Sequence, residues 1–265
     1  MPYAERDGLR LYYERDGSGE PELLFVPGWC CDHTFYEPQF DHFKRTHTVT
    51  ALALRGCGQS DYPEGRYDIA TLADDVAWFC AEVGIEKPVV VGHSLGGMIA
   101  IELGARHPFL PRALVADDPG PVHPTDLASR VFPGFAEQLA GPTGEDVRRA
   151  WVIDGVGPTA DDELRRKIVD TMCSVPLPVA RAVIEGVARW NGVSALVMCM
   201  APLLVLLSEP GGSNDPSRLQ ALRPDVHYGM TVGAGHFHQL EVPEQVNAMI
   251  ERFLAIAIRH SVSVP

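Results

Sequence analysis

The segment Gly92–Gly96, which reads Gly-His-Ser-Leu-Gly, constrains this chain more than any other. It follows the apolar run Pro88–Val91, which is typical of a buried strand, and it precedes the helix-like stretch Gly97–Leu103. A G-x-S-x-G pattern in that context predicts a sharp turn with a strained serine. Small residues must flank the serine because strand and helix pass close together. Ser94 is therefore the first candidate for a nucleophile.

Apolar runs and helical patterns alternate along the rest of the chain. The strand-like runs are Leu9–Tyr13, Leu23–Val26, Val49–Leu54, Pro88–Val91, Ala113–Ala116 and Leu203–Leu207. Helical periodicity marks Ile69–Val83, after the capping residue Asp68, and Val242–Ile258. Strands that alternate with helices predict an α/β fold, in which helices cover both faces of a mostly parallel sheet.

The strand signals stop between Pro119 and about Met200. This interval of about 80 residues is far longer than one crossover connection needs. Helical patterns lie near Pro142–Ile153, Asp161–Cys173 and Pro178–Trp190. We therefore expect a core made of residues 1–120 and 200–265, with a helical cap inserted at residues 121–199.

Charge and composition narrow the class of partner. The 265 residues carry a formal net charge of -13, whereas nucleic acids and anionic membranes demand basic patches. No apolar run approaches the roughly 20 residues that span a bilayer, and no secretory signal opens the sequence. The six cysteines are irregularly spaced, as in proteins with reduced thiols. We expect a cytoplasmic protein with a small apolar substrate. The sequence leaves open whether the protein forms a homodimer.

A serine hydroxyl needs a histidine to take its proton and a carboxylate to orient that histidine. Among ten histidines, His236 stands out, because Thr231–Phe237 reads as a short last strand and a glycine loop before the terminal helix. That position suits the base in the chain order serine, acid, histidine. His238 is the alternative.

Two places in the sequence offer the acid. Asp117 and Asp118 end one strand-like run, while Glu209 and Asp215 follow the last one. Adjacent strand residues point to opposite faces, so only one of Asp117 and Asp118 can serve. The earlier pair is favoured over Glu209 and Asp215, and the choice within the pair stays open.

An oxyanion that forms on an attacked carbonyl needs two preorganised N–H donors. Leu95, which follows the serine, supplies one of them. The turn Pro27–Trp29 comes after a strand and approaches Ser94, so the Trp29 N–H is the candidate for the second.

The substrate pocket is expected between this edge of the sheet and the cap. His93 lies beside the nucleophile, and the cap supplies Trp151 and Trp190, with Phe132 and Phe135, as apolar lining. These residues define the predicted pocket.

Neither a metal nor a cofactor is expected. Asp32 and His33 could suggest a metal pair, but a third ligand at suitable spacing and an H-E-x-x-H pattern are missing. The glycine-rich segment Arg55–Asp61 lacks the lysine and the following helix of a phosphate-binding loop, so we interpret it as a structural turn.

Three segments, Arg55–Asp61, Gly92–Gly97 and Gly235–Phe237, in this spacing, resemble the α/β-hydrolase superfamily over nearly the whole chain. The resemblance implies an α/β-hydrolase fold with a mostly parallel sheet of the eight-stranded type. It leaves the substrate open, since this fold serves many chemistries. Haloalkane dehalogenases and epoxide hydrolases use an aspartate nucleophile, and Ser94 argues against both.

A finer resemblance involves Pro27–His33, the pair His93-Ser94, and Ser208–Pro210. These segments are similar to cofactor-independent dioxygenases that cleave 3-hydroxy-4-oxoquinolines and carry their acid after the earlier strand. This chain has Cys31 and Leu95 where those enzymes have histidines.

The two resemblances imply different acids. Alignment with the dioxygenases implies Asp117, whereas alignment with lactonases such as the zearalenone hydrolases implies Asp118. Both residues are kept as candidates.

We expect a serine hydrolase that cleaves a small, largely apolar carboxylic ester or lactone through an acyl-enzyme. One alternative is a cofactor-free dioxygenase or carbon–carbon cleaving enzyme for an aromatic heterocycle, in which His236 abstracts a substrate proton and Ser94 only positions it. Another is a non-catalytic receptor that binds a small ligand under the cap.

Overall fold

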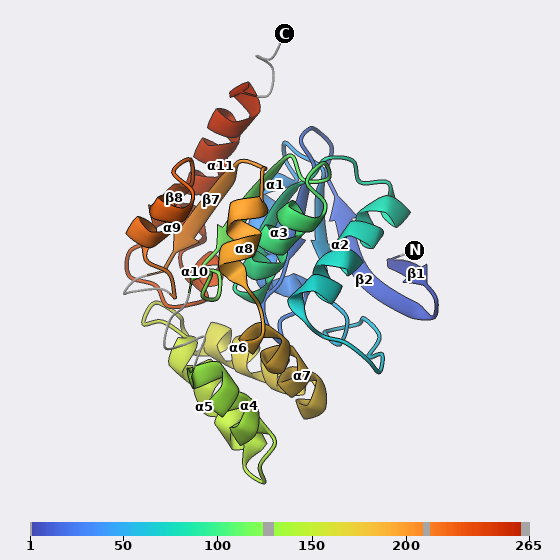
Figure 1. Cartoon of the computed structure of the whole chain (residues 1–265), viewed down its shortest axis with the longest axis vertical. Helices are drawn as coiled ribbons and strands as arrows, with labels where there is room; N and C mark the ends of the chain where they lie inside the picture. The colour runs from blue at the N-terminus through green and yellow to red at the C-terminus, as the bar shows by residue number, and fades with distance from the viewer. Residues whose placement is uncertain (1, 124–129, 209–212, 261–265) are drawn as a thin grey trace.

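A single eight-stranded sheet organises the computed structural model, which describes residues 2–123, 130–208 and 213–260 (Figure 1). The strands are β1 (Tyr3–Arg6), β2 (Leu9–Asp16), β3 (Leu23–Val26), β4 (Val49–Leu52), β5 (Val89–His93), β6 (Ala113–Asp117), β7 (Leu203–Leu207) and β8 (His227–Met230). Their spatial order is β1-β2-β4-β3-β5-β6-β7-β8. β1 and β2 pair antiparallel, β2 pairs antiparallel with β4, and all later pairings are parallel. The predicted α/β-hydrolase architecture is confirmed.

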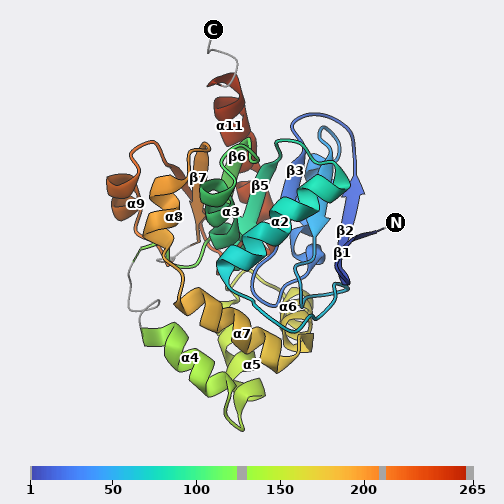
Figure 2. The ribbon, with the colours of Figure 1, turned by 45° about the vertical axis from the view of Figure 1, so that its right-hand side comes forward.

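Helices cover both faces of this sheet. They are η1 (His33–Tyr36), α1 (Glu37–Phe43), α2 (Ile69–Val83), α3 (Leu95–Arg106), α4 (Phe132–Leu139), α5 (Gly144–Gly155), α6 (Asp162–Ser174), α7 (Leu177–Ala188), α8 (Gly192–Met198), α9 (Pro216–Leu222), α10 (His238–Glu241) and α11 (Pro243–His260). α2, α3 and α8 lie on one face and α1 and α11 on the other (Figure 2). In β3, Leu24 and Val26 join one core cluster while Leu23 and Phe25 join the other, as strand alternation requires.

Four helices, α4 to α7, lie together beyond the sheet at the lower end of the molecule (Figures 1 and 2), and we name them the cap helices. α8 instead packs along α3 in the helical layer. Sequence periodicity predicts α5, α6 and α7 but neither α4 nor α8. Both missed helices are short, and Pro133 and Gly134 interrupt the pattern of α4.

The ends of the sheet also differ from expectation. The short last strand predicted at the start of Thr231–Phe237 is wrong, because β8 already ends at Met230 and Val232 is exposed. β1 was not predicted, since only Ala4 of its four residues is buried and no alternating pattern results.

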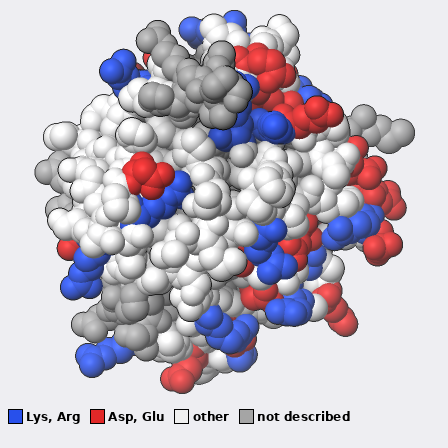
Figure 3. Space-filling view, turned by 45° about the horizontal axis from the view of Figure 1, so that its top comes forward, with Lys and Arg blue, Asp and Glu red and all other residues white. Residues whose placement is uncertain are grey.

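The surface is mixed in charge on the face shown in Figure 3, where basic and acidic side chains lie in small neighbouring groups. Among the described helices, no single one is long and apolar enough to cross a membrane. The pair α6 and α7 passes such a test on length and composition together, but the two helices meet at a bend of 91°.

Backbone segments approach closely at the turn from β5 into α3. A Cβ atom on Gly92 would overlap the carbonyl oxygen of Gly96, and one on Gly96 would overlap that of Val26. Glycine is therefore required at both positions by space.

This packing yields a stability prediction. Gly96→Ala should lower the free energy of unfolding by about 2 kcal/mol or more, because backbone atoms of β3 must move to admit the methyl group. Gly134→Ala is the matched control: its Cβ meets nothing within 4 Å, and it should stabilise helix α4 by roughly 0.5 kcal/mol. Urea unfolding measures both, and equal effects would contradict the packing argument.

Candidate active site

Ser94 lies at the carboxyl edge of the sheet, between β5 and α3. Its backbone has φ 52° and ψ -110°, a region that L-residues rarely adopt. Two hydrogen bonds support this conformation: the Ser94 N–H donates to the carbonyl of Asp117 at 2.9 Å, and the Ser94 carbonyl accepts from Gly97 at 3.1 Å. The strained turn predicted from the sequence is present, and it presents the partly exposed hydroxyl to a cavity.

His236 joins Ser94 from the loop between β8 and α10. Its Nε2 lies 2.9 Å from Ser94 Oγ, and its Nδ1 lies 2.6 Å from Asp118 Oδ2. A carboxylate can only accept, so Nδ1 donates to Asp118 and the lone pair of Nε2 faces the hydroxyl. The backbone N–H of His236 donates to the carbonyl of Gly155, at the end of α5. The loop that carries this histidine is thus tied to the cap helices.

Asp118 follows β6 in a left-handed conformation, with φ 44°. Its carboxylate accepts from the N–H of Ser208 at 3.0 Å and from the hydroxyl of Ser208 at 2.8 Å, besides the bond from His236. Burial acts to raise the pKa of this carboxyl, but the hydrogen bond and charge of His236, the charge of His238 and the Ser208 N–H outweigh it. The pKa of Asp118 is therefore held well below its usual range.

The structure separates the two adjacent aspartates. Asp118 reaches His236, whereas the carboxylate of Asp117 lies 2.6 Å from Nε2 of His238 and does not contact His236. Asp215 caps α9 by accepting from the Ser217 N–H, and Glu209 lies outside the described residues. Ser208, which anchors Asp118, was not predicted, since its role depends on the parallel pairing of β6 with β7.

The turn after β3 lies against Ser94. A Cβ on Gly28 would meet Ser94 Cβ at 3.3 Å, and the Trp29 indole N–H fixes the turn by donating to the carbonyl of Ala180 in α7. Within the described residues, the backbone N–H groups of Trp29 and Leu95 donate to no protein acceptor. Both remain available to a ligand.

A cavity of about 210 Å³ opens at Ser94 beneath the cap helices. Apolar side chains dominate its wall: Trp29, Leu95, Met98, Phe132, Trp151, Val152, Met172, Ile184, Val187 and Phe237. Trp151 lines the cavity as predicted and stacks on Phe135, with ring centroids 4.4 Å apart. The charged or titratable side chains on the described wall are Asp154, His93 and His236, besides the thiol of Cys31.

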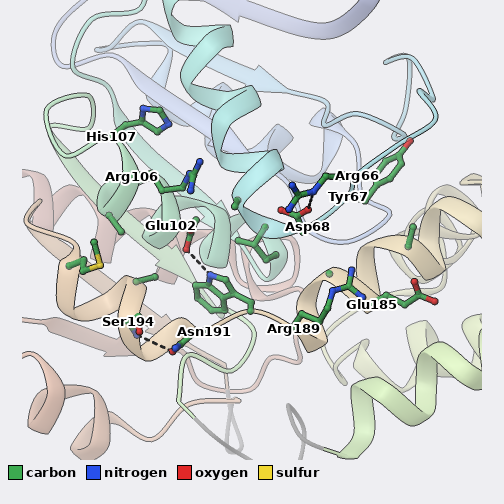
Figure 4. Close-up of a pocket in the computed structure, with 18 of the residues that line it drawn as sticks. Arg66, Tyr67, Asp68, Glu102, Arg106, His107, Glu185, Arg189, Asn191 and Ser194 are labelled. Atoms are coloured by element: carbon green, nitrogen blue, oxygen red, sulfur yellow. Dashed lines mark hydrogen bonds and ion pairs between the residues drawn. The ribbon is translucent and has the colours of Figure 1, made fainter.

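Trp190 does not lie on the described wall of this cavity. Its indole N–H donates to Glu102 at 2.8 Å, and Trp190 lines a separate open hollow between α2, α3, α7 and α8. Figure 4 shows this hollow, with Glu102, Glu185 and Ser194 labelled on its wall. Trp190 lies two residues beyond the end of α7, where sequence spacing does not predict the direction of a side chain.

His93 lies on the cavity wall but is buried. Its Nε2 donates to the carbonyl of His236 at 2.8 Å, and its Nδ1 has no hydrogen-bond partner in the described structure. Burial, with the nearby charge of His236, lowers the pKa of His93 to about 3. The ring is therefore neutral at physiological pH, and it holds the backbone of the His236 loop.

Comparisons with known proteins identify proteins of the same fold. The model of a family described as having the alpha/beta hydrolase fold matches residues 21–164. The chain is 27% identical to the 2-(acetamidomethylene)succinate hydrolase of Mesorhizobium japonicum, over 93% of this chain and 92% of that protein. It is also 27% identical to the dihydrolipoyllysine-residue acetyltransferase component of the acetoin cleaving system of Cupriavidus necator, over 95% of this chain and 68% of that protein.

Solved structures agree in fold. The enol-lactonase from Burkholderia xenovorans superposes with a TM-score of 0.82 at 20% identity, covering 96% of this chain and all (100%) of that one. A thermophilic esterase from Thermogutta terrifontis gives a TM-score of 0.82 at 24% identity, covering 97% of each chain.

The lowered pKa of Asp118 predicts a pH dependence of stability. The carboxyl of Asp118 binds its proton more weakly in the folded protein than in the unfolded chain. Its contribution to the free energy of unfolding is therefore fully present above the usual pKa of about 4, and it is lost as the pH falls toward the pKa of the folded protein. Relative to Asp118→Asn, the wild-type free energy of unfolding should fall between pH 5 and pH 3. Urea unfolding of both proteins at several pH values measures this difference. Free energies of unfolding that change with pH in parallel would contradict the prediction.

Proposed function

The chain belongs to the alpha/beta hydrolase fold family and is a hydrolase, and from that premise we propose that it cleaves a small, largely apolar carboxylic ester or lactone through a Ser94–His236–Asp118 triad. The observation that carries the proposal is the continuous hydrogen-bonded chain from Ser94 Oγ through both ring nitrogens of His236 to Asp118. In that arrangement a buried carboxylate fixes the tautomer of a histidine whose free nitrogen faces a hydroxyl.

The proposed reaction begins with proton transfer. His236 Nε2 takes the proton of Ser94 while Oγ attacks the carbonyl carbon, and the carbonyl electron pair moves onto oxygen. Asp118 stabilises the imidazolium that forms. Return of the carbonyl electron pair breaks the bond to the alkoxide, which takes the proton from His236. Water, deprotonated by the same nitrogen, then attacks the acyl carbon, and Ser94 Oγ leaves with that proton. These reaction steps need no cofactor.

The proposed oxyanion donors are the N–H groups of Leu95 and Trp29. Leu95 begins α3, so its N–H has no acceptor in the preceding turn. Trp29 belongs to the turn that packs on Ser94, and its anchored indole fixes the backbone of that turn. Preorganised donors of this kind are worth about 3 kcal/mol each toward a developing negative charge.

Cavity size and charge support the substrate class. A volume of about 210 Å³ is somewhat larger than the roughly 150 Å³ apolar cavity that accepts benzene. The wall is mostly apolar, and its described side chains include no Lys or Arg. A succinate, as named for the Mesorhizobium relative, is a dicarboxylate, and it would meet Asp154 here without a paired cation. A neutral acyl group or lactone of about phenyl size suits this cavity better.

Replacing the nucleophile tests the mechanism. Ser94→Ala should lower kcat/KM for phenyl acetate and small lactones by about 10⁴-fold or more, because no acyl-enzyme can form. Ser213→Ala removes a different hydroxyl from the same cavity wall and should stay within a fewfold of wild type. Initial rates, with circular dichroism to confirm folding, measure both.

Oxygen uptake in the same assays addresses the alternatives. Uptake with a 3-hydroxy-4-oxoquinoline that survives in Ser94→Ala would replace hydrolysis by cofactor-free oxygenation. A ligand-induced rise in melting temperature without turnover of any ester or lactone would favour a receptor.

The two aspartates are distinguished by isosteric substitution. Asp118→Asn should lower kcat on the order of 10⁴-fold, because the amide favours the wrong tautomer of His236. Asp117→Asn keeps the same shape one residue away and should lower kcat much less than Asp118→Asn does, because Asp117 bonds to His238 and does not contact the His236 ring. Steady-state kinetics decide, and the reverse order would assign the acid to Asp117.

A further inference from the structure

A second histidine–aspartate pair lies buried behind the proposed triad. Asp117 and His238 are both fully buried (0% side-chain exposure), and Asp117 Oδ1 lies 2.6 Å from His238 Nε2. The other carboxylate oxygen accepts from the Tyr36 hydroxyl at 3.1 Å, and His238 Nδ1 lies 3.0 Å from Thr231 Oγ1. The pair lies off the described wall of the cavity, so it does not touch substrate there.

The two pairs interlock along the chain. Asp117 and Asp118 are neighbours at the end of β6, and Phe237 separates His236, in the loop after β8, from His238, the first residue of α10. One aspartate bonds to each histidine, so two short hydrogen bonds join the end of β6 to the junction of this loop with α10. The Asp117 carbonyl also accepts from the Ser94 N–H, so this residue connects the nucleophile turn with the His238 anchor.

The hydrogen bonds around His238 suit a doubly protonated ring. Nε2 donates to Asp117, and Nδ1 can donate to Thr231 Oγ1, whose own hydroxyl can donate to the Leu207 carbonyl at 3.4 Å. Burial acts to lower the pKa of His238, but the charge and hydrogen bond of Asp117 outweigh it, so the pKa is raised. Each charge thus has an opposite partner at hydrogen-bond distance.

We propose that Asp117 and His238 are positioning residues for the triad proposed above: their ion pair fixes the loop of His236 against the strand end of Asp118, and the positive charge of His238 cancels the negative charge of Asp117 beside the base. The inference rests on the proposed function for its catalytic meaning. Without His238, an uncompensated carboxylate would lie next to the site and favour the protonated form of His236.

Other titratable groups face this pair from the neighbouring elements. They are Tyr36 of η1, His93 of β5, Asp118 after β6 and Glu241 of α10, while Cys31 lies near Tyr36. Burial and Asp117 raise the pKa of Tyr36, and burial keeps His93 neutral, so neither adds a charge at neutral pH. Asp118 and Glu241 are present in every variant compared below.

The test is an NMR titration of the His236 ring, which requires no turnover. His238→Gln should raise the pKa of His236 by about one pH unit, the order expected for one uncompensated charge nearby in a protein interior. The double variant Asp117→Asn/His238→Gln removes both charges and keeps an amide pair, so it should return the pKa of His236 close to the wild-type value. The acid limb of the kcat/KM profile should move in parallel.

A merely structural pair would give a different result. Equal pKa values of His236 in wild type and His238→Gln, or a shift that persists in the double variant, would overturn the charge balance. If His238→Gln fails to fold, the nitrogen chemical shifts of His238 in the wild type decide: two protonated nitrogens at neutral pH support the proposal, and one overturns it.

Failure of the proposed function would be distinguishable from failure of this inference. If the wild-type protein hydrolyses no ester or lactone, the pKa of His236 can still be measured by NMR in every variant. A shift in the titration without such activity would keep the charge balance while removing its role in hydrolysis.

Discussion

The close crossing of β5 and α3 at Ser94 is the constraint on which the rest of the site depends. Gly92 and Gly96 allow the strand and the helix to approach until a single methyl group would overlap backbone oxygen. That approach forces Ser94 into a left-handed conformation and directs its hydroxyl toward the cavity. It also leaves the Leu95 N–H at the start of a helix, next to the hydroxyl. One packing requirement therefore sets both the proposed nucleophile and one proposed oxyanion donor.

Sequence could predict the parts of the site that depend on local pattern. Ser94 and His236 were predicted to lie together because glycines and apolar flanks indicate a turn and a loop at these positions, and the structure shows that contact. The choice between Asp117 and Asp118 could not be made, because it depends on a positive φ at residue 118 and on Ser208, which arrives from β7. Aspartate tolerates a left-handed backbone, but local sequence does not require it there. The direction of the Trp190 side chain depends on how the chain leaves α7, and helical periodicity does not predict that.

The cap helices do more than cover the cavity. The carbonyl of Gly155 in α5 holds the backbone of His236, and the carbonyl of Ala180 in α7 holds the indole of Trp29. The proposed base and the proposed oxyanion turn are thus each bonded to a different cap helix. A displacement of α5 or α7 relative to the sheet would therefore strain one of these two hydrogen bonds.

Three histidines within one cluster show how burial and partners divide one residue type into separate roles. His93 is buried without a carboxylate, and burial lowers its pKa to about 3, so it serves as a neutral donor to the His236 carbonyl. His238 is just as buried, yet Asp117 reverses the sign of its shift. His236 alone keeps one third of its side chain exposed and one nitrogen facing a hydroxyl. Only His236 combines a nitrogen that faces the Ser94 hydroxyl with a place on the cavity wall. In the proposed site, Asp118 orients this ring, while the neutral His93 and the paired His238 add no net charge beside it.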